Sequence, residues 1–476
     1  MVFAIAFLGN AAANFLFGLL LSGTLGPAEF GRYATAALGS SVVAILAFDW
    51  LRLSTYRFTL SLGDSKRAAS SLELGFLIMS LACLALGGLA AFLRLDFGLG
   101  SRLALMTFVL AIANARFDYR GARLRSQDEP VAFARLSMAR QGLLFTVVIA
   151  VAWFSRSAIA TIAALALAQA LASLSARVAD GGGAALQRAR FSDIKAFIRY
   201  SAPIVTATAL FMAIGLVNRE IAMTRFGAAE TDKLALATDL SFRLFMVFNF
   251  LPETVLFQIA MRREAREGAA AASRQIRLNQ VIALSLIAPI AIGYMVMAPT
   301  FEALIVPKAY HGDYAVLSRD LAPGFLAYCA IYAICNPVFQ LNRRTWPAAL
   351  AALGAFALNL ALAFSPRFSH DIEGLALAHS ASLIFAFGVA AILAMRQRAA
   401  RPRWRDLAAI AAATALMALA IRPLNGIPSA PLAATLAVLG GGALFAALLF
   451  LFDVAGMRGL ALARLRDGTP ASLTAR

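Results

Sequence analysis

The sequence predicts an all-α polytopic membrane protein of about 14 transmembrane helices, arranged as two pseudo-symmetric six-helix lobes with two further C-terminal helices. Three observations lead to this fold class. Of the 476 residues, 61% are hydrophobic and 14% are charged, with a mean hydropathy of +0.76. Apolar segments long enough to cross a bilayer recur along the chain, and one turn segment recurs at an offset of 201 residues. This composition lies outside the range of soluble domains.

The apolar segments define the expected helices in order. A helix rises about 1.5 Å per residue, so about 20 residues cross roughly 30 Å of hydrocarbon. The segments of this kind are 2–24, 33–57, 72–93, 101–118, 131–154, 158–176, 198–223, 234–260, 278–300, 320–341, 345–365, 374–395, 406–422 and 431–452. The first lacks the basic leader and cleavage site of a secretory signal, so we expect it to remain as the first helix.

The formal net charge of +18 is interpreted by its position along the chain. Loops after even-numbered spans hold most of the Lys and Arg residues, notably the stretches 262–277 and 396–405. By the positive-inside rule these loops are cytoplasmic, and so are both termini. Because the basic residues follow membrane topology in this way, nucleic acid is not an expected partner.

The repeated turn predicts the division into lobes. Residues 25–36 and 226–237 share Gly, Ala, Glu, a basic residue and two further Ala at equivalent positions, and six spans separate them. An even number of spans preserves orientation, so the repeat is parallel about an axis along the membrane normal. The alternative is chance similarity between two alanine-rich turns. The expected domains are an N-lobe with its linker at 1–195, a C-lobe at 196–398, two extra helices at 399–455 and a cytoplasmic tail at 456–476.

Arginines inside the apolar segments carry the functional prediction. An arginine at mid-helix costs about 2.5–3.5 kcal/mol on insertion scales, so these side chains should face a hydrated cavity, and a cationic cavity predicts an anionic passenger. The six arginines interpreted as embedded in apolar segments are Arg52, Arg57, Arg135, Arg140, Arg219 and Arg243. Arg57 and Arg135 are close to span ends, from which a long side chain reaches the interface. The candidate substrate-binding residues are therefore Arg52, Arg140, Arg219 and Arg243, whose planar guanidinium groups suit phosphate oxygens.

Acidic residues in the same spans leave two alternatives open. Asp49 with Arg52 and Asp239 with Arg243 are spaced i,i+3 and i,i+4, so each pair could neutralise itself on one helix face. Asp49, Asp239 and Glu253 are also candidates for binding a coupling H⁺ or Na⁺, since burial disfavours their charged form. Glu253 follows Pro252, which interrupts the helical hydrogen bonds or simply bends the helix.

Other classes of site are not expected. The chain has no Gly-rich phosphate loop followed by Lys, so ATP should not drive it directly. His311, His370 and His379 are expected on or near external loops and lack metal-ligand spacing. We therefore expect no metal site and no cofactor beyond the coupling ion. The segment around 301–320 is too short for an extramembrane catalytic domain, and the last two helices could offer an apolar groove for a lipid tail.

Several motifs resemble one transporter family. They are residues 24–33 (TLGPAEFGRY), 306–310 (VPKAY), 321–323 (LAP) and 340–345 (QLNRRT), which are spread over much of the chain. The sequence resembles the polysaccharide biosynthesis transporter family, the O-antigen flippase branch of the multidrug/oligosaccharidyl-lipid/polysaccharide (MOP) exporter superfamily. It departs from the family in having no basic residue before the first span.

The resemblance implies two six-helix lobes around a V-shaped cavity and transport by alternating access. The implied passenger is an undecaprenyl-pyrophosphate-linked oligosaccharide for O-antigen or exopolysaccharide synthesis, carried across the bacterial cytoplasmic (inner) membrane, with a glycan polymerase or assembly proteins as partners. The resemblance thus favours a secondary transporter over an enzyme. The alternatives are a multidrug or small-molecule antiporter of the superfamily, a membrane glycan polymerase or ligase, and a lipid II transporter, to which the sequence is less similar.

Overall fold

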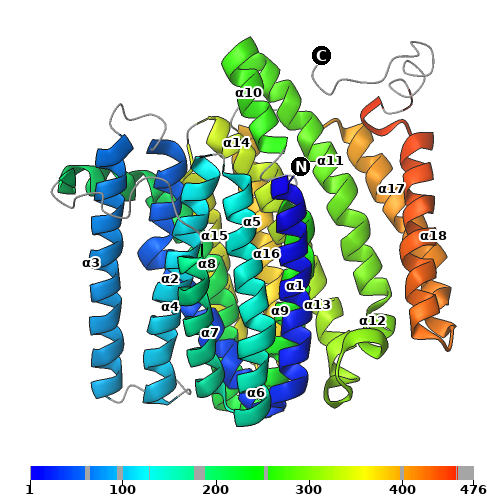
Figure 1. Cartoon of the computed structure of the whole chain (residues 1–476). Coiled ribbons are helices and arrows are strands. Elements are labelled where there is room, and N and C mark those ends of the chain that lie inside the picture. Colours follow the sequence, from blue (N-terminus) through cyan, green and yellow to red (C-terminus); the bar gives the residue numbers. More distant parts are fainter. Residues whose placement is uncertain are drawn as a thin grey trace.

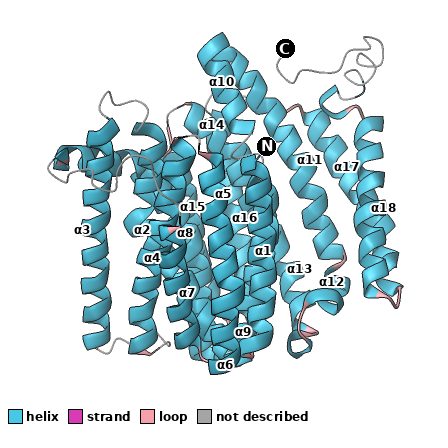
Figure 2. Ribbon diagram, in the orientation of Figure 1, coloured by secondary structure: helices cyan, strands magenta, loops and turns pink. Residues whose placement is uncertain are grey.

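The computed structural model describes residues 2–58, 65–93, 100–127, 129–175, 188–250, 256–342, 344–396, 401–456 and 458. Within these residues all regular secondary structure is helical (Figure 2). The α-helices are α1 (Val2–Leu25), α2 (Pro27–Phe58), α3 (Ser65–Phe92), α4 (Ser101–Ser126), α5 (Pro130–Leu143), α6 (Ile149–Ser155), α7 (Ala158–Leu174), α8 (Phe191–Phe226), α9 (Ala228–Phe250), α10 (Phe257–Glu267), α11 (Ala269–Val296), α12 (Ala298–Ile305), α13 (Asp313–Ala330), α14 (Asn336–Leu341), α15 (Trp346–Ala363), α16 (Ile372–Arg396), α17 (Trp404–Ile421) and α18 (Ala430–Leu451).

The all-α polytopic fold class is confirmed, and helices occupy most of the described residues of each predicted apolar segment. Among the described residues, ten helices are long and apolar enough to cross a membrane, and two shorter apolar helices accompany them. One predicted span, 131–154, is continuous through a π-helical turn, Leu144–Val148, that joins α5 to α6. The boundaries differ most where helices continue beyond the hydrocarbon. The helix predicted over 101–118 extends to Ser126, and the helix predicted from 198 begins at Phe191.

The helices run alternately between two ends of the bundle (Figure 1). α1 begins and α18 ends at the same end, where α10 also lies with its arginines. We call this the basic end, and the other the opposite end. α2 is central, because it packs against α4, α8 and α9, whereas α17 and α18 lie at one side and contact α11 and α12.

The two similar turns of the sequence also have the same geometry. Gly26 and Gly227 have φ of 75° and 85°, in the left-handed region that favours glycine, and α2 and α9 begin directly after them. In the first helical turn of α2, Glu29 binds Arg32 at 2.8 Å; in that of α9, Glu230 binds Lys233 at 2.7 Å. The repeat is therefore structural at these turns. The lobe boundaries at 195 and 196 remain a prediction.

Glycines allow some helices to approach closely, as is common between membrane helices. The clearest case lies between α13 and α16. A Cβ atom at Gly324 would lie 2.6 Å from the Cα atom of Ser380, and the main-chain nitrogen of Gly324 donates a hydrogen bond of 2.8 Å to Ser380 Oγ. The two backbones are thus in direct contact.

We expect Gly324→Ala to destabilise the protein, because the added methyl group must push two helix backbones apart at a cost of about 1–3 kcal/mol. Gly388→Ala on α16 is the matched control, since no atom lies within 4 Å of a Cβ there and alanine is the better helix former. Thermal denaturation of the purified proteins in detergent should give a lower midpoint for Gly324→Ala and an unchanged or higher midpoint for Gly388→Ala. Equal midpoints would contradict the close contact.

Candidate functional site

A central cavity of about 330 Å³ lies between the first and second halves of the chain. Helices α1, α2, α4, α5 and α7 line it from the first half, and α8, α9, α13 and α16 from the second. Its charged lining consists of three arginines and one aspartate: Arg140, Arg219, Arg243 and Asp239. Two positive charges are therefore not balanced within the lining. A cavity of this sign attracts an anion.

Arg219 on α8 is the most deeply buried of these arginines, with 1% of its surface exposed. It forms a very short ion pair with Asp239 on α9, and its Nη1 donates a hydrogen bond of 2.9 Å to the main-chain oxygen of Ala34 on α2. Its Nε makes no hydrogen bond. Because a buried charge needs such partners, Arg219 connects the second half of the chain to the first.

Arg243, one turn after Asp239 on α9, is bonded to α1. Its Nη1 donates a very short hydrogen bond to the main-chain oxygen of Asn14, and its guanidinium carbon lies 3.3 Å from where a Cβ atom would stand at Gly18. A side chain at Gly18 would crowd this group. The predicted pairing of Asp239 with Arg243 is therefore wrong: Asp239 binds Arg219, and Arg243 uses a main-chain acceptor from the other half.

Arg140 on α5 has the guanidinium group with the fewest hydrogen bonds of the three. It lies over the ring of Phe117 on α4, with 5.1 Å between its guanidinium carbon and the ring centroid, and its buried Nε makes no hydrogen bond. A cation over an aromatic face is attracted by the ring quadrupole, yet this leaves the N–H donors in the guanidinium plane available. Arg140 can therefore donate to a ligand in the cavity.

A second cavity, of about 270 Å³, adjoins the central one on the side of the basic end. Arg140 lines both cavities, as do Asn114 and Gln169, whose side chains share a hydrogen bond of 2.9 Å. Arg52 and Asp49 of α2 also line the second cavity. Together the two cavities form a path, lined in part by charged and polar side chains, from the centre of the bundle toward the basic end.

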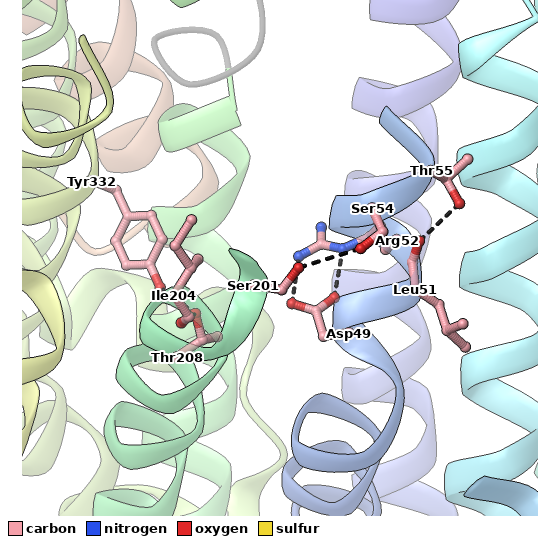
Figure 3. A network of polar contacts seen from close by, with 9 residues as sticks. All are labelled: Asp49, Leu51, Arg52, Ser54, Thr55, Ser201, Ile204, Thr208 and Tyr332. Carbon is pink, nitrogen blue, oxygen red and sulfur yellow. Dashed lines mark hydrogen bonds and ion pairs between the residues drawn. The ribbon is translucent and has the colours of Figure 1, made fainter. Parts of the chain in front are cut away.

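Arg52 and Asp49 form a bidentate ion pair on α2 (Figure 3), with Arg52 Nε 2.6 Å from Asp49 Oδ1 and Arg52 Nη2 2.9 Å from Oδ2. The predicted i,i+3 pairing is confirmed. The Arg52 side chain remains 41% exposed. Beside this pair, Ser54 of α2 lies 3.5 Å from Ser201 of α8, Oγ to Oγ. The pair thus sits where the two halves meet.

The remaining predicted residues lie elsewhere. Arg135 is exposed and lines neither cavity, as expected for a residue near a helix end. The side chain of Arg57 and all of Glu253 lie outside the described residues. In the described part of the chain, no group of three or more His, Cys, Asp or Glu residues could hold a metal ion.

Several charged and polar residues were missed by sequence reasoning. Asp118 of α4 lines the second cavity, and Glu73 of α3 binds Arg116 and Arg123 at 2.8 and 3.2 Å. The signal that could have found them is the helical spacing of the charged residues at 116, 120 and 123. This spacing continues beyond residue 118, where the predicted apolar segment ends. His379, expected near the surface, is 6% exposed and lines the central cavity instead, because α16 continues through it.

An apolar groove of about 470 Å³ lies apart from the charged cavities. It is bounded by α11 and α12 on one side and by α17 and α18 on the other, with Pro289, Met297, Met417, Val438 and Gly442 among its lining. The expected apolar groove at the last two helices is therefore present.

We expect Asp239→Asn to be strongly destabilising, by about 3–5 kcal/mol, because it leaves the buried guanidinium of Arg219 without its counter-charge. Asp49→Asn is the matched control and should cost about 0–1 kcal/mol, since its partner Arg52 is 41% exposed. Thermal denaturation in detergent measures both. Adding Arg219→Gln to Asp239→Asn should recover stability, and a double variant as unstable as the sum of the two single variants would contradict the pair.

Comparisons with known proteins identify the fold. No protein-family model matches the sequence, and neither does any curated protein. Among solved structures, the lipid II flippase MurJ in an inward closed conformation matches with a TM-score of 0.67 and 13% identity, over 95% of this chain and 98% of that one. An inward-facing multidrug resistance MATE family transporter of the MOP superfamily matches with a TM-score of 0.57 and 12% identity, over 83% and 97%. A MOP superfamily transporter from Pyrococcus furiosus matches with a TM-score of 0.52 and 14% identity, over 83% and 94%. The chain therefore has the MOP-type transporter fold.

Proposed function

We propose that this protein is a flippase that moves an undecaprenyl-pyrophosphate-linked oligosaccharide across the bacterial cytoplasmic membrane by alternating access. The observation that carries the proposal is the cavity between the two halves, where three arginines face one aspartate. A diphosphate headgroup supplies the missing negative charge and several acceptor oxygens. Arginine binds such oxygens bidentately and remains charged at physiological pH.

The contacts of the arginines suggest how binding and movement are coupled. Arg219 and Arg243 belong to the second half, and both donate to main-chain oxygens of the first half, those of Ala34 and Asn14. An anionic phosphate oxygen is a stronger acceptor for a guanidinium group than a neutral carbonyl, because the two partners carry opposite charges and can bind bidentately. A headgroup that replaced these carbonyls would weaken the ties between the halves. Binding would then favour one arrangement of the lobes over another, which is what transport by alternating access requires.

The two parts of the proposed substrate differ in polarity, and the protein offers surfaces of both kinds. The path through the two cavities, with its charged and polar side chains, suits sugars and diphosphate. The groove between α11, α12, α17 and α18 is apolar and suits part of a polyprenyl chain. Burial of hydrocarbon there would contribute through packing, since lipid itself is equally apolar.

The second candidate is a multidrug or small-molecule antiporter, favoured by the fold similarity to a multidrug resistance MATE family transporter. The net positive charge of the central cavity disfavours cationic drugs, because like charges repel. Normal surface glycan combined with drug sensitivity in a deletion strain would support this candidate. A glycan polymerase or ligase would instead leave flipped but unpolymerised repeat units in the outer leaflet of that strain.

The similarity to a lipid II flippase concerns the same substrate chemistry, a sugar joined to a polyprenyl diphosphate. In a deletion strain, accumulation of undecaprenyl-linked repeat units on the inner leaflet, with intact cell-wall synthesis, would separate glycan export from lipid II transport. In the proposed orientation the basic end and both termini are cytoplasmic. H⁺ or Na⁺ coupling and interaction with a glycan polymerase or assembly proteins remain part of the proposal.

We expect Arg140→Gln and Arg243→Gln each to lower export by about 10- to 100-fold, because a hydrogen bond to a charged group contributes about 1.5–3 kcal/mol. Arg140→Lys should restore little activity if the bidentate geometry matters, and most of it if charge alone matters. Surface glycan and inner-leaflet lipid-linked oligosaccharide are the measurements.

Arg135→Gln is the matched control for these variants, since Arg135 lies outside both cavities, and its export should equal that of the wild type. Full export by a variant with Arg52, Arg140, Arg219 and Arg243 all replaced by Gln would overturn the proposed site.

We expect Gly442→Phe to reduce export by filling the apolar groove without disturbing the fold. Gly442 lines the groove, and no atom lies within 4 Å of a Cβ there. Gly440→Phe is the control, because Gly440 also has open space around it but does not line the groove. Transport of lipid-linked oligosaccharide into proteoliposomes should fall for the first variant alone. Equal rates for both would show that the groove is not used.

A further inference from the structure

The turns that begin α2 and α9 meet at the opposite end of the bundle. A Cβ atom at Gly31 would lie 3.1 Å from the main-chain oxygen of Ala228 and 3.2 Å from the Cα atom of Asp232. The first turns of the two helices are thus in backbone contact. Gly31 and Asp232 are also equivalent positions of the 201-residue repeat. Because two equivalent residues touch each other, the pseudo-two-fold axis passes between them, and their contact joins the two halves of the chain at the opposite end of the bundle.

Asp232 is a carboxyl group buried within this contact. It is 0% exposed, and neither of its carboxylate oxygens has a hydrogen-bond partner. The hydroxyl group of Tyr310, from the turn Lys308–Tyr310, interacts with the carboxyl but stands outside hydrogen-bonding geometry, and it too is buried without a partner. An ionised carboxylate in such a place is very costly.

The cations nearest to Asp232 are already engaged. Lys233 binds Glu230 at 2.7 Å and Asp313 at 2.9 Å. Arg219 of α8 binds Asp239 and the main-chain oxygen of Ala34. From α2, Arg32 binds Glu29 at 2.8 Å. Arg219 and Lys233 favour the ionised form of Asp232 only through their electric field, because their hydrogen bonds go to other acceptors, and the effect of burial is larger.

We propose that Asp232 is a proton-binding residue of an external gate: it is neutral while the turns of α2 and α9 touch, and its ionisation favours their separation. When the turns part, water reaches the carboxyl group and stabilises its charge. The closed gate then holds the proton more tightly than the open gate. By linkage, low pH on this side favours closure, and closure is lost as the pH rises.

This inference rests on the alternating access of the proposed function, and it adds a proton site separate from Asp49, Asp239 and Glu253. It also explains the residues at the two equivalent positions. Glycine at 31 provides the space that the backbone of Asp232 occupies, so only one of the two copies can carry a side chain here.

The test measures how readily the central cavity is reached from outside, without any substrate. A cysteine at Ala37, which lines the central cavity, is treated with a membrane-impermeant maleimide added outside intact spheroplasts at pH 5.5 to 8.5. The native cysteines Cys83, Cys329 and Cys335 are buried, and the protein without the new cysteine gives their background. A cysteine at the exposed residue Ser429, in the turn between α17 and α18, corrects for the faster reaction of thiolate at high pH.

We expect the corrected labelling rate at Ala37→Cys to rise about threefold or more between pH 5.5 and pH 8.5, as the gate opens. Asp232→Asn should keep it low at every pH, because the amide cannot ionise. Gly31→Ala should keep it high at every pH, because its methyl group blocks closure. Glu373→Gln, at an exposed acid in the first turn of α16, is the control, and it should leave the pH response unchanged.

A pH-dependent rise that persists in Asp232→Asn, or a parent protein without any rise, would overturn the proposal. If Asp232→Asn does not reach the membrane, Tyr310→Phe serves instead. The Tyr310 hydroxyl favours the ionised form of the carboxyl group, so its removal should move the rise to higher pH, and an unmoved midpoint would count against the gate. If labelling follows the prediction while glycan export is normal without the protein, the flippase function fails and the gate stands.

Discussion

The free energy of a positive charge inside the bilayer is the constraint on which this architecture depends. Each cavity arginine must be hydrated or given acceptors, because a guanidinium in hydrocarbon is too costly. For Arg219 and Arg243 the acceptors come from the other half of the chain, from Ala34 on α2 and Asn14 on α1. The charges that make the cavity cationic therefore also connect the two halves. In the proposed function, binding of an anion and the relative position of the halves are coupled for this reason.

The three arginines of the central cavity differ in the number and kind of their partners. Arg219 has an aspartate and a carbonyl, Arg243 has a carbonyl, and Arg140 has an aromatic ring. An incoming diphosphate would meet the arginine with the fewest competing acceptors first. Arg140 also lines both cavities, so it is placed to contact a headgroup at either position. In the proposed function, Arg140 is therefore the first arginine to bind the headgroup and Arg219 the last.

The sequence predicted the helices far better than it predicted the partners of the charges. Hydropathy is a property of consecutive residues, so the apolar segments locate the helices, and the cost of buried charge places Arg140, Arg219 and Arg243 in a cavity. The acceptor of Arg243 lies 229 residues away and is a main-chain oxygen, which no sequence pattern encodes. The pairing of Asp239 was predicted from local spacing and was decided by Arg219 on a neighbouring helix. Asp118 is the last residue of the predicted segment 101–118, whereas α4 continues beyond it to Ser126, so hydropathy did not show that this acid lies well inside a helix.

The repeat shows how two similar halves acquire different roles. Both turns keep the positive-φ glycine and the ion pair of the first helical turn, which are requirements of the backbone. At the next equivalent position the copies differ, with Gly31 in one and Asp232 in the other. Two aspartates facing each other across the axis would repel when ionised and would lack space, whereas two glycines would leave nothing there to bind a proton. A single acid against a glycine gives close packing and one titratable group, and this asymmetry is what the proposed proton-sensitive gate requires.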